Sequence, residues 1–172
     1  SKYQGTMNTF DLIKVNDANQ KVTGDPVAFF ANLGGIKGAD GNVFTSTKYP
    51  ALLDSGTTLI SAPQEVQKAV VSKYGRYDLK QKTYLTDCDT GGPDFTFTFT
   101  DAMDGTDINI SVPFKNFLYP LSNYNYNGKA QCLLGFSGNT RGSYILGDAF
   151  LRLAYVYYDL ENFQLGIAQA KF

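Results

Sequence analysis

The sequence predicts a mostly-β domain that contains a single long helix. Aromatic residues make up 15% of the 172 residues, with 12 Tyr and 13 Phe, and such side chains favour strands. Residues 94–100 (DFTFTFT) alternate strictly between polar and apolar, so Phe95, Phe97 and Phe99 share one face of a strand. Apolar residues at helical spacing occur over one longer stretch, residues 63–74. The length fits one domain, residues 1–172, with a sizeable core.

The N-terminal part reads as strands joined by polar turns. Residues 6–15 (TMNTFDLIKV) predict a strand that ends at a turn over 16–19. Residues 22–33 predict one or two further strands, broken at 24–26 (GDP). The glycine-rich stretch 33–41 (LGGIKGADG) lacks the Gly-Lys-Ser/Thr ending of a phosphate-binding loop and is not followed by a helical pattern. We therefore expect a strand and a hairpin turn there.

The long helix is expected at about residues 63–74. Ser61 is placed to cap it, with Pro63 in the first turn and Gln64 at the capping-box position. Gly75 is expected to end it. The apolar residues on its core-facing side are Val66, Ala69, Val70 and Tyr74.

The second half of the chain predicts further strands with short helical turns between them. The expected strands are 77–88, 94–100, 107–112, 131–136, 144–146, 153–158 and 163–168, of which 144–146 enters the centre of the sheet and the last two form a hairpin. Helical turns are expected at 113–118 and 148–151. Residues 119–129 (YPLSNYNYNGK) read as a polar, tyrosine-rich loop and 137–139 as a turn.

Composition excludes several classes of function. The chain has no His, which removes Ser-His-Asp and Cys-His catalysis and His-ligated zinc. The net charge is −1 and no basic stripe suggests a nucleic-acid partner. No run of about 18 apolar residues could span a bilayer. We expect neither a metal nor a cofactor.

The stretch 49–61 (YPALLDSGTTLIS) places a carboxylate inside an apolar run. Removing a carboxylate from water is costly unless hydrogen-bond donors surround it. Ser55, Thr57, Thr58 and the backbone N–H of Gly56 can supply such donors to Asp54. The alternative is a simple Asp-Ser-Gly turn between two strands, which is a common arrangement.

Two separated motifs together resemble the pepsin-like aspartic proteinases. Residues 54–58 (DSGTT), after the apolar residues 51–53, resemble the catalytic Asp-Thr/Ser-Gly signature of that family. Residues 144–152 (YILGDAFLR) resemble its Ile-Leu-Gly-Asp strand and short helix. The opening residues 2–6 and the tail 154–169 extend the likeness over the whole chain, and it is closest to the secreted yeast members.

The resemblance implies one lobe of a bilobal fold. A complete family member has two Asp-Thr/Ser-Gly motifs, one in each lobe, whereas this chain has one. Residues 1–172 are therefore expected to be the C-terminal catalytic lobe of a secreted enzyme (extracellular, or else in the cell wall or vacuole), and the chain to start at a processed or truncated end. The N-terminal lobe, with the second aspartate and a tyrosine-bearing flap, is the expected partner. The isolated chain is expected to be inactive.

The resemblance also implies roles for the motif residues. Asp54 would be one of two aspartates that activate water for peptide-bond hydrolysis at acid pH, and pepstatin-like inhibitors would bind there. Ser55 would bond across to the other lobe, while Gly56 and Thr57 would hold Asp54 ionised and oriented. Gly56, Thr57 and Thr58 would also bond the backbone of a peptide substrate.

Residues outside the Asp54 motif receive roles as well. Ile145 would line a specificity pocket, residues 146–147 would pack against the Asp54 turn, and Asp148 is expected to cap a helix. The two cysteines can be free buried thiols, as in a cytosolic chain, but the likeness to secreted enzymes favours a Cys88–Cys132 disulfide. Asn109 begins a glycosylation sequon, Asn-Ile-Ser.

Two other functions compete with the proteinase lobe. The chain can pair with a second copy, as retroviral-type proteinases do, and bring two Asp54 side chains together. Alternatively, it is a non-catalytic binding module on a pepsin-like fold. An intact Asp-Ser-Gly-Thr run argues against the second of these, because a binding protein does not need to keep such a carboxylate.

Overall fold

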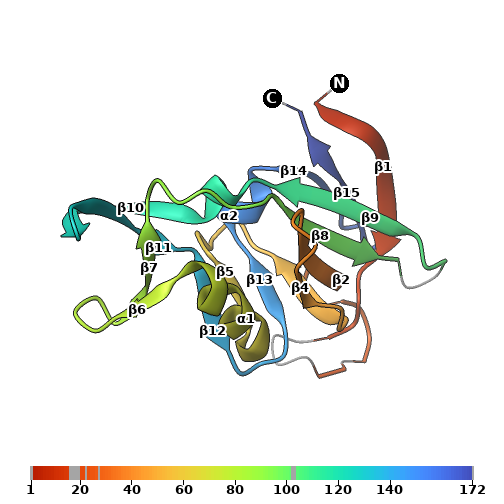
Figure 1. Cartoon of the computed structure of the whole chain (residues 1–172). Coiled ribbons are helices and arrows are strands. Elements are labelled where there is room, and N and C mark those ends of the chain that lie inside the picture. The colour runs from red at the N-terminus through yellow and green to blue at the C-terminus, as the bar shows by residue number, and fades with distance from the viewer. Residues whose placement is uncertain (1, 16–19, 22, 27, 102–103, 172) are drawn as a thin grey trace.

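The computed structural model describes residues 2–15, 20–21, 23–26, 28–101 and 104–171, and strands dominate it (Figure 1). The strands are β1 Tyr3–Asp11, β2 Phe30–Gly38, β3 Val43–Thr45, β4 Tyr49–Leu53, β5 Ile60–Pro63, β6 Arg76–Asp78, β7 Thr83–Asp87, β8 Phe95–Thr100, β9 Asp107–Val112, β10 Leu118–Tyr126, β11 Lys129–Leu134, β12 Phe136–Asn139, β13 Tyr144–Leu146, β14 Ala154–Asp159 and β15 Gln164–Ala170. The helices are α1 Gln64–Tyr74, the 3-10 turn η1 Phe114–Phe117 and α2 Asp148–Leu151. The predicted mostly-β class with one longer helix is confirmed.

The largest sheet has the strand order β12-β5-β13-β4-β2-β8-β9, with β3 paired to β2. Strand β13 lies inside this sheet, as predicted, and its neighbours there are β5 and β4. It runs parallel to β4, with Leu146 opposite Leu53. Because the two strands are parallel and in register, their C-terminal ends meet at one edge of the sheet. Asp54 follows β4 and Gly147 follows β13, so this pairing brings the two motifs of the sequence together.

The core lies against one face of this sheet and is rich in phenylalanine. Phe95, Phe97 and Phe99 on β8 are fully buried, as their alternation predicted. The ring of Phe150 on α2 packs against Phe97 and Phe99 at centroid distances of 5.2 and 5.7 Å. Burying such side chains contributes about 1.5–3 kcal/mol each, so this cluster anchors α2 behind the turn that contains Asp54.

Helix α1 matches the predicted extent, but its predicted cap at Ser61 is wrong. The residue before the helix is Pro63, and no side chain caps the first turn. Ser61 belongs to β5, where its hydroxyl accepts a hydrogen bond of 2.8 Å from the side-chain amide of Asn139. Pairing of β5 with β12 continues to Pro63, so the helix starts directly from a strand and leaves no room for a capping turn. Gly75 ends the helix, as expected, with its N–H on the carbonyl of Val71.

A second sheet, in the order β10-β11-β7-β6, lies to the side of the central sheet (Figure 1). The loop predicted over residues 119–129 is wrong, because β10 and β11 form an antiparallel hairpin there. Asn127 and Gly128 make its tight turn, both with positive φ, and the Asn-Gly pair is a strong hairpin signal. No residue of β10 is buried and five of its nine residues are exposed, so the strand lacks the buried face on which pattern-based prediction depends. The turn predicted at 137–139 is also wrong, since these residues belong to β12.

The third sheet, β1-β15-β14, joins the two ends of the chain. Its β14–β15 hairpin was predicted correctly. Strand β1 runs over Tyr3–Asp11 rather than over the predicted residues 6–15. Residues 23–25 form a bend near the break predicted at 24–26, and the strand predicted after that break, β2, starts only at Phe30. The predicted turn at 16–19 lies outside the described residues. The N–H of Lys171 bonds the carbonyl of Lys2 at 3.1 Å, so the ends lie side by side (Figure 1).

The remaining predicted elements are largely present. The glycine-rich stretch forms the end of β2 and a turn into β3, with Gly41 at a φ of 85°. Residues 77–88 hold two short strands instead of one. Strand β9 and the helical turn η1 fall where expected. No helix in the described ranges combines the length and the apolar character needed to cross a membrane.

Candidate active site

Asp54 lies at the end of β4, in a turn that the neighbouring strand holds in place. Its N–H bonds the carbonyl of Leu146 on β13 at 3.1 Å, and its own carbonyl accepts the N–H of Thr57 at 3.2 Å. The residue is half-buried, while Ser55 and Gly56 beside it are exposed. The sheet therefore fixes the backbone of Asp54 and leaves the tip of the turn open to solvent.

The Asp54 carboxylate is held at both oxygens. The N–H of Gly56 donates to Oδ1 at 2.9 Å, and the Thr57 hydroxyl donates to Oδ2 at 2.6 Å. The Thr57 hydroxyl and, after it, the Gly56 N–H lower the pKa of Asp54, and partial burial opposes them. Hydrogen bonds to the charged form favour that form, so the turn both orients this carboxylate and stabilises it as an anion.

The Ile-Leu-Gly-Asp motif packs directly behind this turn. Carbonyl groups of Thr57 and Leu59 accept the N–H groups of Asp148 at 2.8 Å and Gly147 at 3.2 Å. A Cβ on Gly147 would lie 2.2 Å from the Thr57 carbonyl oxygen, so only glycine allows this approach. The prediction that residues 146–147 pack against the Asp54 turn is confirmed.

Asp148 does not cap a helix, contrary to the prediction. It is the first residue of α2, the preceding residue is Gly147, and no side chain caps this helix. The N–H groups at its start bond carbonyls of the Asp54 turn instead, so a capping carboxylate has nothing to accept. The Asp148 carboxylate faces Arg152 at 3.9 Å.

An open, mainly apolar hollow of about 620 Å³ lies beside Asp54 and Ser55. Its other lining residues are Ala28, Phe29, Leu52, Leu53, Tyr158 and Leu160. The rings of Phe29 and Tyr158 meet edge to face with centroids 4.6 Å apart. Burial, and secondarily the charge of Asp54, raise the pKa of the Tyr158 hydroxyl, which stays protonated. Sequence reasoning missed Phe29 and Tyr158, because only the fold brings these residues, which are far from Asp54 in the sequence, to its side.

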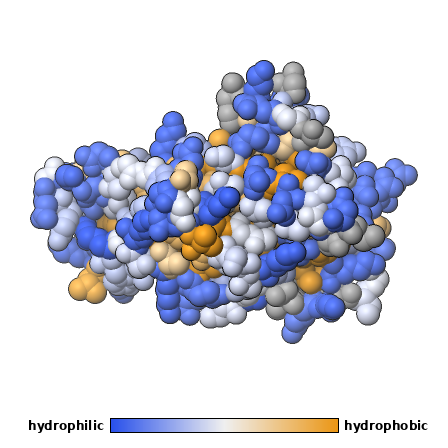
Figure 2. All heavy atoms as spheres, turned by 45° about the vertical axis from the view of Figure 1, so that its right-hand side comes forward, coloured by the Kyte–Doolittle hydropathy of each residue, from blue (hydrophilic) through white to orange (hydrophobic). Residues whose placement is uncertain are grey.

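Apolar side chains remain exposed at the margin of this hollow. Leu160, which lines the hollow directly after β14, is 70% exposed, and Tyr158 on β14 is 37% exposed. On one face of the molecule, Figure 2 shows apolar patches among mostly hydrophilic residues. Such a margin is typical of a surface that another protein segment covers.

The other predicted site residues are spread over the fold. Thr58 is exposed, next to the Asp54 turn. Ile145 is half-buried in β13 opposite Leu52 and does not line the hollow beside Asp54. Asn109 is exposed on β9, where its side-chain carbonyl accepts the Thr98 hydroxyl at 2.7 Å.

Cys88 and Cys132 form the predicted disulfide, which ties the end of β7 to β11 in the second sheet. Across the described ranges, no three acidic or thiol side chains gather as a metal site requires.

Comparison with known proteins identifies the family of this chain. A family model described as "Eukaryotic aspartyl protease" matches residues 1–170. The chain belongs to the eukaryotic aspartyl protease family. Its pepsin-like resemblance, predicted from the two motifs, is thereby confirmed.

Several aspartyl proteases from yeasts match along most or all of the chain. An acid protease of Saccharomycopsis fibuligera is 46% identical over 172 residues, which cover 100% of this chain and 41% of that protein. Aspartic proteinase 3 of Saccharomyces cerevisiae is 35% identical over 100% of this chain and 29% of its own length. Secreted aspartic protease 1 of Candida albicans is 39% identical over 70% of this chain and 30% of its own length. The chain thus spans less than half the length of these relatives.

Proposed function

We propose that this chain is the C-terminal lobe of a secreted aspartic endopeptidase and supplies one aspartate of its catalytic pair. The observation that carries the proposal is the Asp54 carboxylate, which two donors orient at the open edge of the lobe. A carboxylate that served only to close a turn would not need to face an apolar hollow of about 620 Å³.

The proposed chemistry needs two carboxylates and a water molecule. Two carboxylates held close together cannot both ionise easily, so the pair shares one proton. The ionised group takes a proton from the water as it attacks the scissile carbonyl, and the protonated group hydrogen-bonds the carbonyl oxygen. Asp54 provides one of these groups, and an N-terminal lobe on another polypeptide segment provides the other.

The residues around Asp54 have supporting roles in this proposal. Thr57 and Gly56 orient the carboxylate, and the exposed side chain of Ser55 bonds the backbone of the other lobe. Thr58, together with Gly56 and Thr57, bonds the backbone of the peptide substrate.

The surroundings also suggest the partners of this lobe. Ile145, half-buried beside Leu52, contributes to a specificity pocket once the second lobe closes the cleft. The apolar hollow and exposed Leu160 suit coverage by that lobe. Pepstatin-like inhibitors bind at the completed pair. Secretion is supported by the Cys88–Cys132 disulfide, since disulfides persist in oxidising compartments, and by the similarity to a secreted protease.

The experiment combines this chain with an N-terminal lobe from a yeast aspartyl protease and measures peptide cleavage at acid pH. We expect pepstatin-sensitive cleavage by the combined protein, none by the isolated 172-residue chain, and none after Asp54→Asn. Asp104→Asn is the matched control, because Asp104 is an exposed aspartate that closes a different turn. A correctly folded two-lobed protein that cleaves no peptide would contradict the proposal and favour a binding module.

The homodimer alternative gives the opposite result for the isolated chain. If two copies paired their Asp54 side chains, the chain alone would cleave peptides, and Asp54→Asn would abolish that cleavage. Sedimentation analysis of the isolated chain would then show a dimer at the concentrations where it is active.

A further inference from the structure

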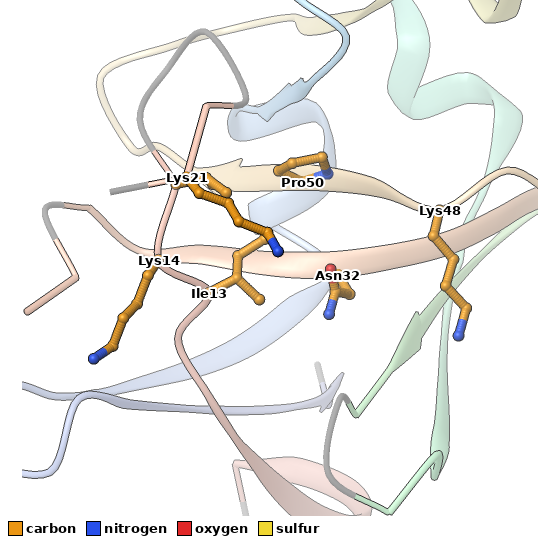
Figure 3. Close-up of a pocket in the computed structure, with 7 residues that line it drawn as sticks. Ile13, Lys14, Lys21, Asn32, Lys48 and Pro50 are labelled. Atoms are coloured by element: carbon orange, nitrogen blue, oxygen red, sulfur yellow. The ribbon is translucent and has the colours of Figure 1, made fainter. Parts of the chain in front are cut away.

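A second depression, of about 550 Å³, opens beside the start of β4 and carries three lysines (Figure 3). Its lining residues are Ile13, Lys14, Val15, Lys21, Asn32, Lys48 and Pro50. We call it the lysine pocket. In Figure 3 the ammonium group of Lys21 points toward Asn32 and Ile13, while those of Lys14 and Lys48 lie to either side. The pocket thus combines an apolar floor with positive charge around its rim.

Among the residues that the structure describes, no carboxylate lines this pocket, and no ion pair involves these three lysines. A carboxylate does contact β4 near this pocket, because the hydroxyl of Tyr49 donates a hydrogen bond to Glu65 of α1. Tyr49 and Pro50 are successive strand residues and point to opposite faces of the sheet. The Glu65 carboxylate is therefore directed away from the lysine pocket, which leaves the pocket suited to an anionic group.

The lysine pocket and the hollow at Asp54 are both lined by residues on one face of strand β4. Pro50 of β4 and its cross-strand partner Asn32 of β2 line the lysine pocket. Leu52, two residues further along β4, lines the hollow at Asp54. Residues two apart on a strand share a face, so a ligand lying along this face meets both depressions.

The spacing fits an extended peptide. Pro50 precedes Asp54 by four residues, and a strand advances about 3.3 Å per residue, so the two sites lie roughly 13 Å apart. An extended substrate has the same rise. A peptide whose scissile carbonyl is at Asp54 therefore places a side chain three to five residues away at the lysine pocket.

We propose that the lysine pocket is a substrate subsite that selects an ionised acidic side chain three to five residues from the scissile bond. This inference rests on the proposed endopeptidase function and names one feature of its substrates. The ligand is a Glu or Asp of the peptide, whose carboxylate meets the ammonium groups while its methylene groups lie on Ile13 and Pro50. Partly exposed ion pairs contribute modestly, so the expected preference for Glu over Gln is roughly two- to fivefold in kcat/KM.

The preference has a characteristic pH dependence. A Glu side chain of the substrate ionises around pH 4.3, so the carboxylate that the pocket selects is present only above roughly that pH. The preference for Glu over Gln is therefore small at pH 3 and reaches its full size by about pH 5. A phosphoserine at the same position is already anionic at pH 3 and keeps the preference there.

The test uses the two-lobed protein and peptides in which Glu or Gln is placed in turn at each position up to five residues on either side of the scissile bond. We expect one position to favour Glu. That preference disappears in Lys21→Ala/Lys48→Ala and reverses in Lys21→Glu/Lys48→Glu. Lys80→Ala/Lys82→Ala is the matched control, because these lysines are exposed on the distant β6–β7 hairpin.

A second measurement separates this inference from the proposed function. Binding of the Glu and Gln peptides to the 172-residue chain is followed through the backbone amide signals of Asn32 and Lys48. Cleavage with no Glu preference at any position, or a preference unchanged by the lysine variants, overturns the subsite and leaves the endopeptidase intact. Absence of cleavage with lysine-dependent binding overturns the endopeptidase and keeps the acid-binding pocket. Absence of both overturns both.

Discussion

The hydroxyl of Tyr119 donates a hydrogen bond of 3.1 Å to the backbone carbonyl of Thr58. Tyr119 lies on β10, more than sixty residues after the Asp54 turn, and burial raises the pKa of its hydroxyl, which stays protonated as a donor. Its ring covers Gly135, where an added Cβ would lie 2.8 Å from the ring. The contact therefore braces the exposed end of the Asp54 turn from the hairpin of the second sheet.

Tyr119→Phe tests this brace in the two-lobed enzyme. The loss of one hydrogen bond costs about 0.5–1.5 kcal/mol, so we expect kcat/KM to fall roughly two- to tenfold. Because Tyr119 contacts Thr58, one of the residues proposed to bond the substrate backbone, the change should lie mainly in KM and leave the pH profile unchanged. Tyr126→Phe, at an exposed tyrosine on the same strand, is the control. Equal kinetics for the two variants would contradict the role of Tyr119.

Gly147→Ala should disrupt the contact behind the Asp54 turn. The new methyl group would overlap the carbonyl oxygens of Thr57 and Leu59, 2.2 and 2.6 Å away, and neither backbone group can rotate aside. Overpacking of this kind costs about 1–3 kcal/mol. Urea unfolding of the chain measures it, with Gly91→Ala as the control, because no atom lies within 4 Å of the Cβ position there. A Gly147→Ala protein as stable as the control would mean that α2 can move away.

Thr57→Val should raise the pKa of Asp54. The Thr57 hydroxyl is the largest cause of the lowered pKa, and valine has the same shape without the donor. A carboxylate whose pKa is lowered by folding stabilises the fold above its unfolded pKa and loses that contribution as the pH falls through the folded value. An NMR titration of the Asp54 carboxyl carbon measures the shift, and Thr57→Ser should restore the low value. A titration unchanged by Thr57→Val would leave Gly56 as the sole cause.

Asp78 gives a second pH-dependent contribution, in the second sheet. Backbone N–H groups of Gln81 and Lys80, the Tyr124 hydroxyl and the Arg76 guanidinium surround its carboxylate and lower its pKa to about 2. Its stabilisation should be complete above about pH 4 and fade as the pH falls toward 2.

Urea unfolding at pH 5 and pH 2.5 tests this contribution. The wild-type chain should lose more stability between the two pH values than Asp78→Asn, which lacks the titrating group. Asp94→Asn, at an exposed aspartate, should lose as much as wild type. If Asp78→Asn lost equally much, the acid sensitivity would have to come from other carboxylates.

Much of this architecture could be predicted from local patterns. The alternation around Phe97 and the apolar spacing around Val70 are signals that burial on one face imposes, and both led to correct elements. The hairpin formed by β10 was missed because its residues are largely exposed on both faces. In a hairpin with this exposure, only the residues of the turn indicate from the sequence that two strands pair.

The candidate site, too, could be predicted only in part from the sequence. Of the four donors predicted for Asp54, Gly56 and Thr57 bond its carboxylate, since a turn of four residues determines their distances. Ser55 and Thr58, predicted with them, are exposed and do not contribute to the lowered pKa of Asp54. Phe29, Tyr119 and Tyr158 could not, because sheet pairing over long separations brings them to the turn. The predicted helix cap at Asp148 is wrong for a related reason. Backbone carbonyls of the Asp54 turn accept the N–H groups at the start of α2, which the capping rule assigns to a side chain of the helix itself.

The bond between Lys171 and Lys2 makes this lobe suitable for circular permutation. A few glycine and serine residues can join positions so close, and the chain can be reopened at Leu79, an 83% exposed residue on the tip of the β6–β7 connection. New chain ends at Leu79 would leave the pairing of β1 with β15 intact. A tether or a fluorophore could then be attached at these ends, far from the Asp54 carboxylate.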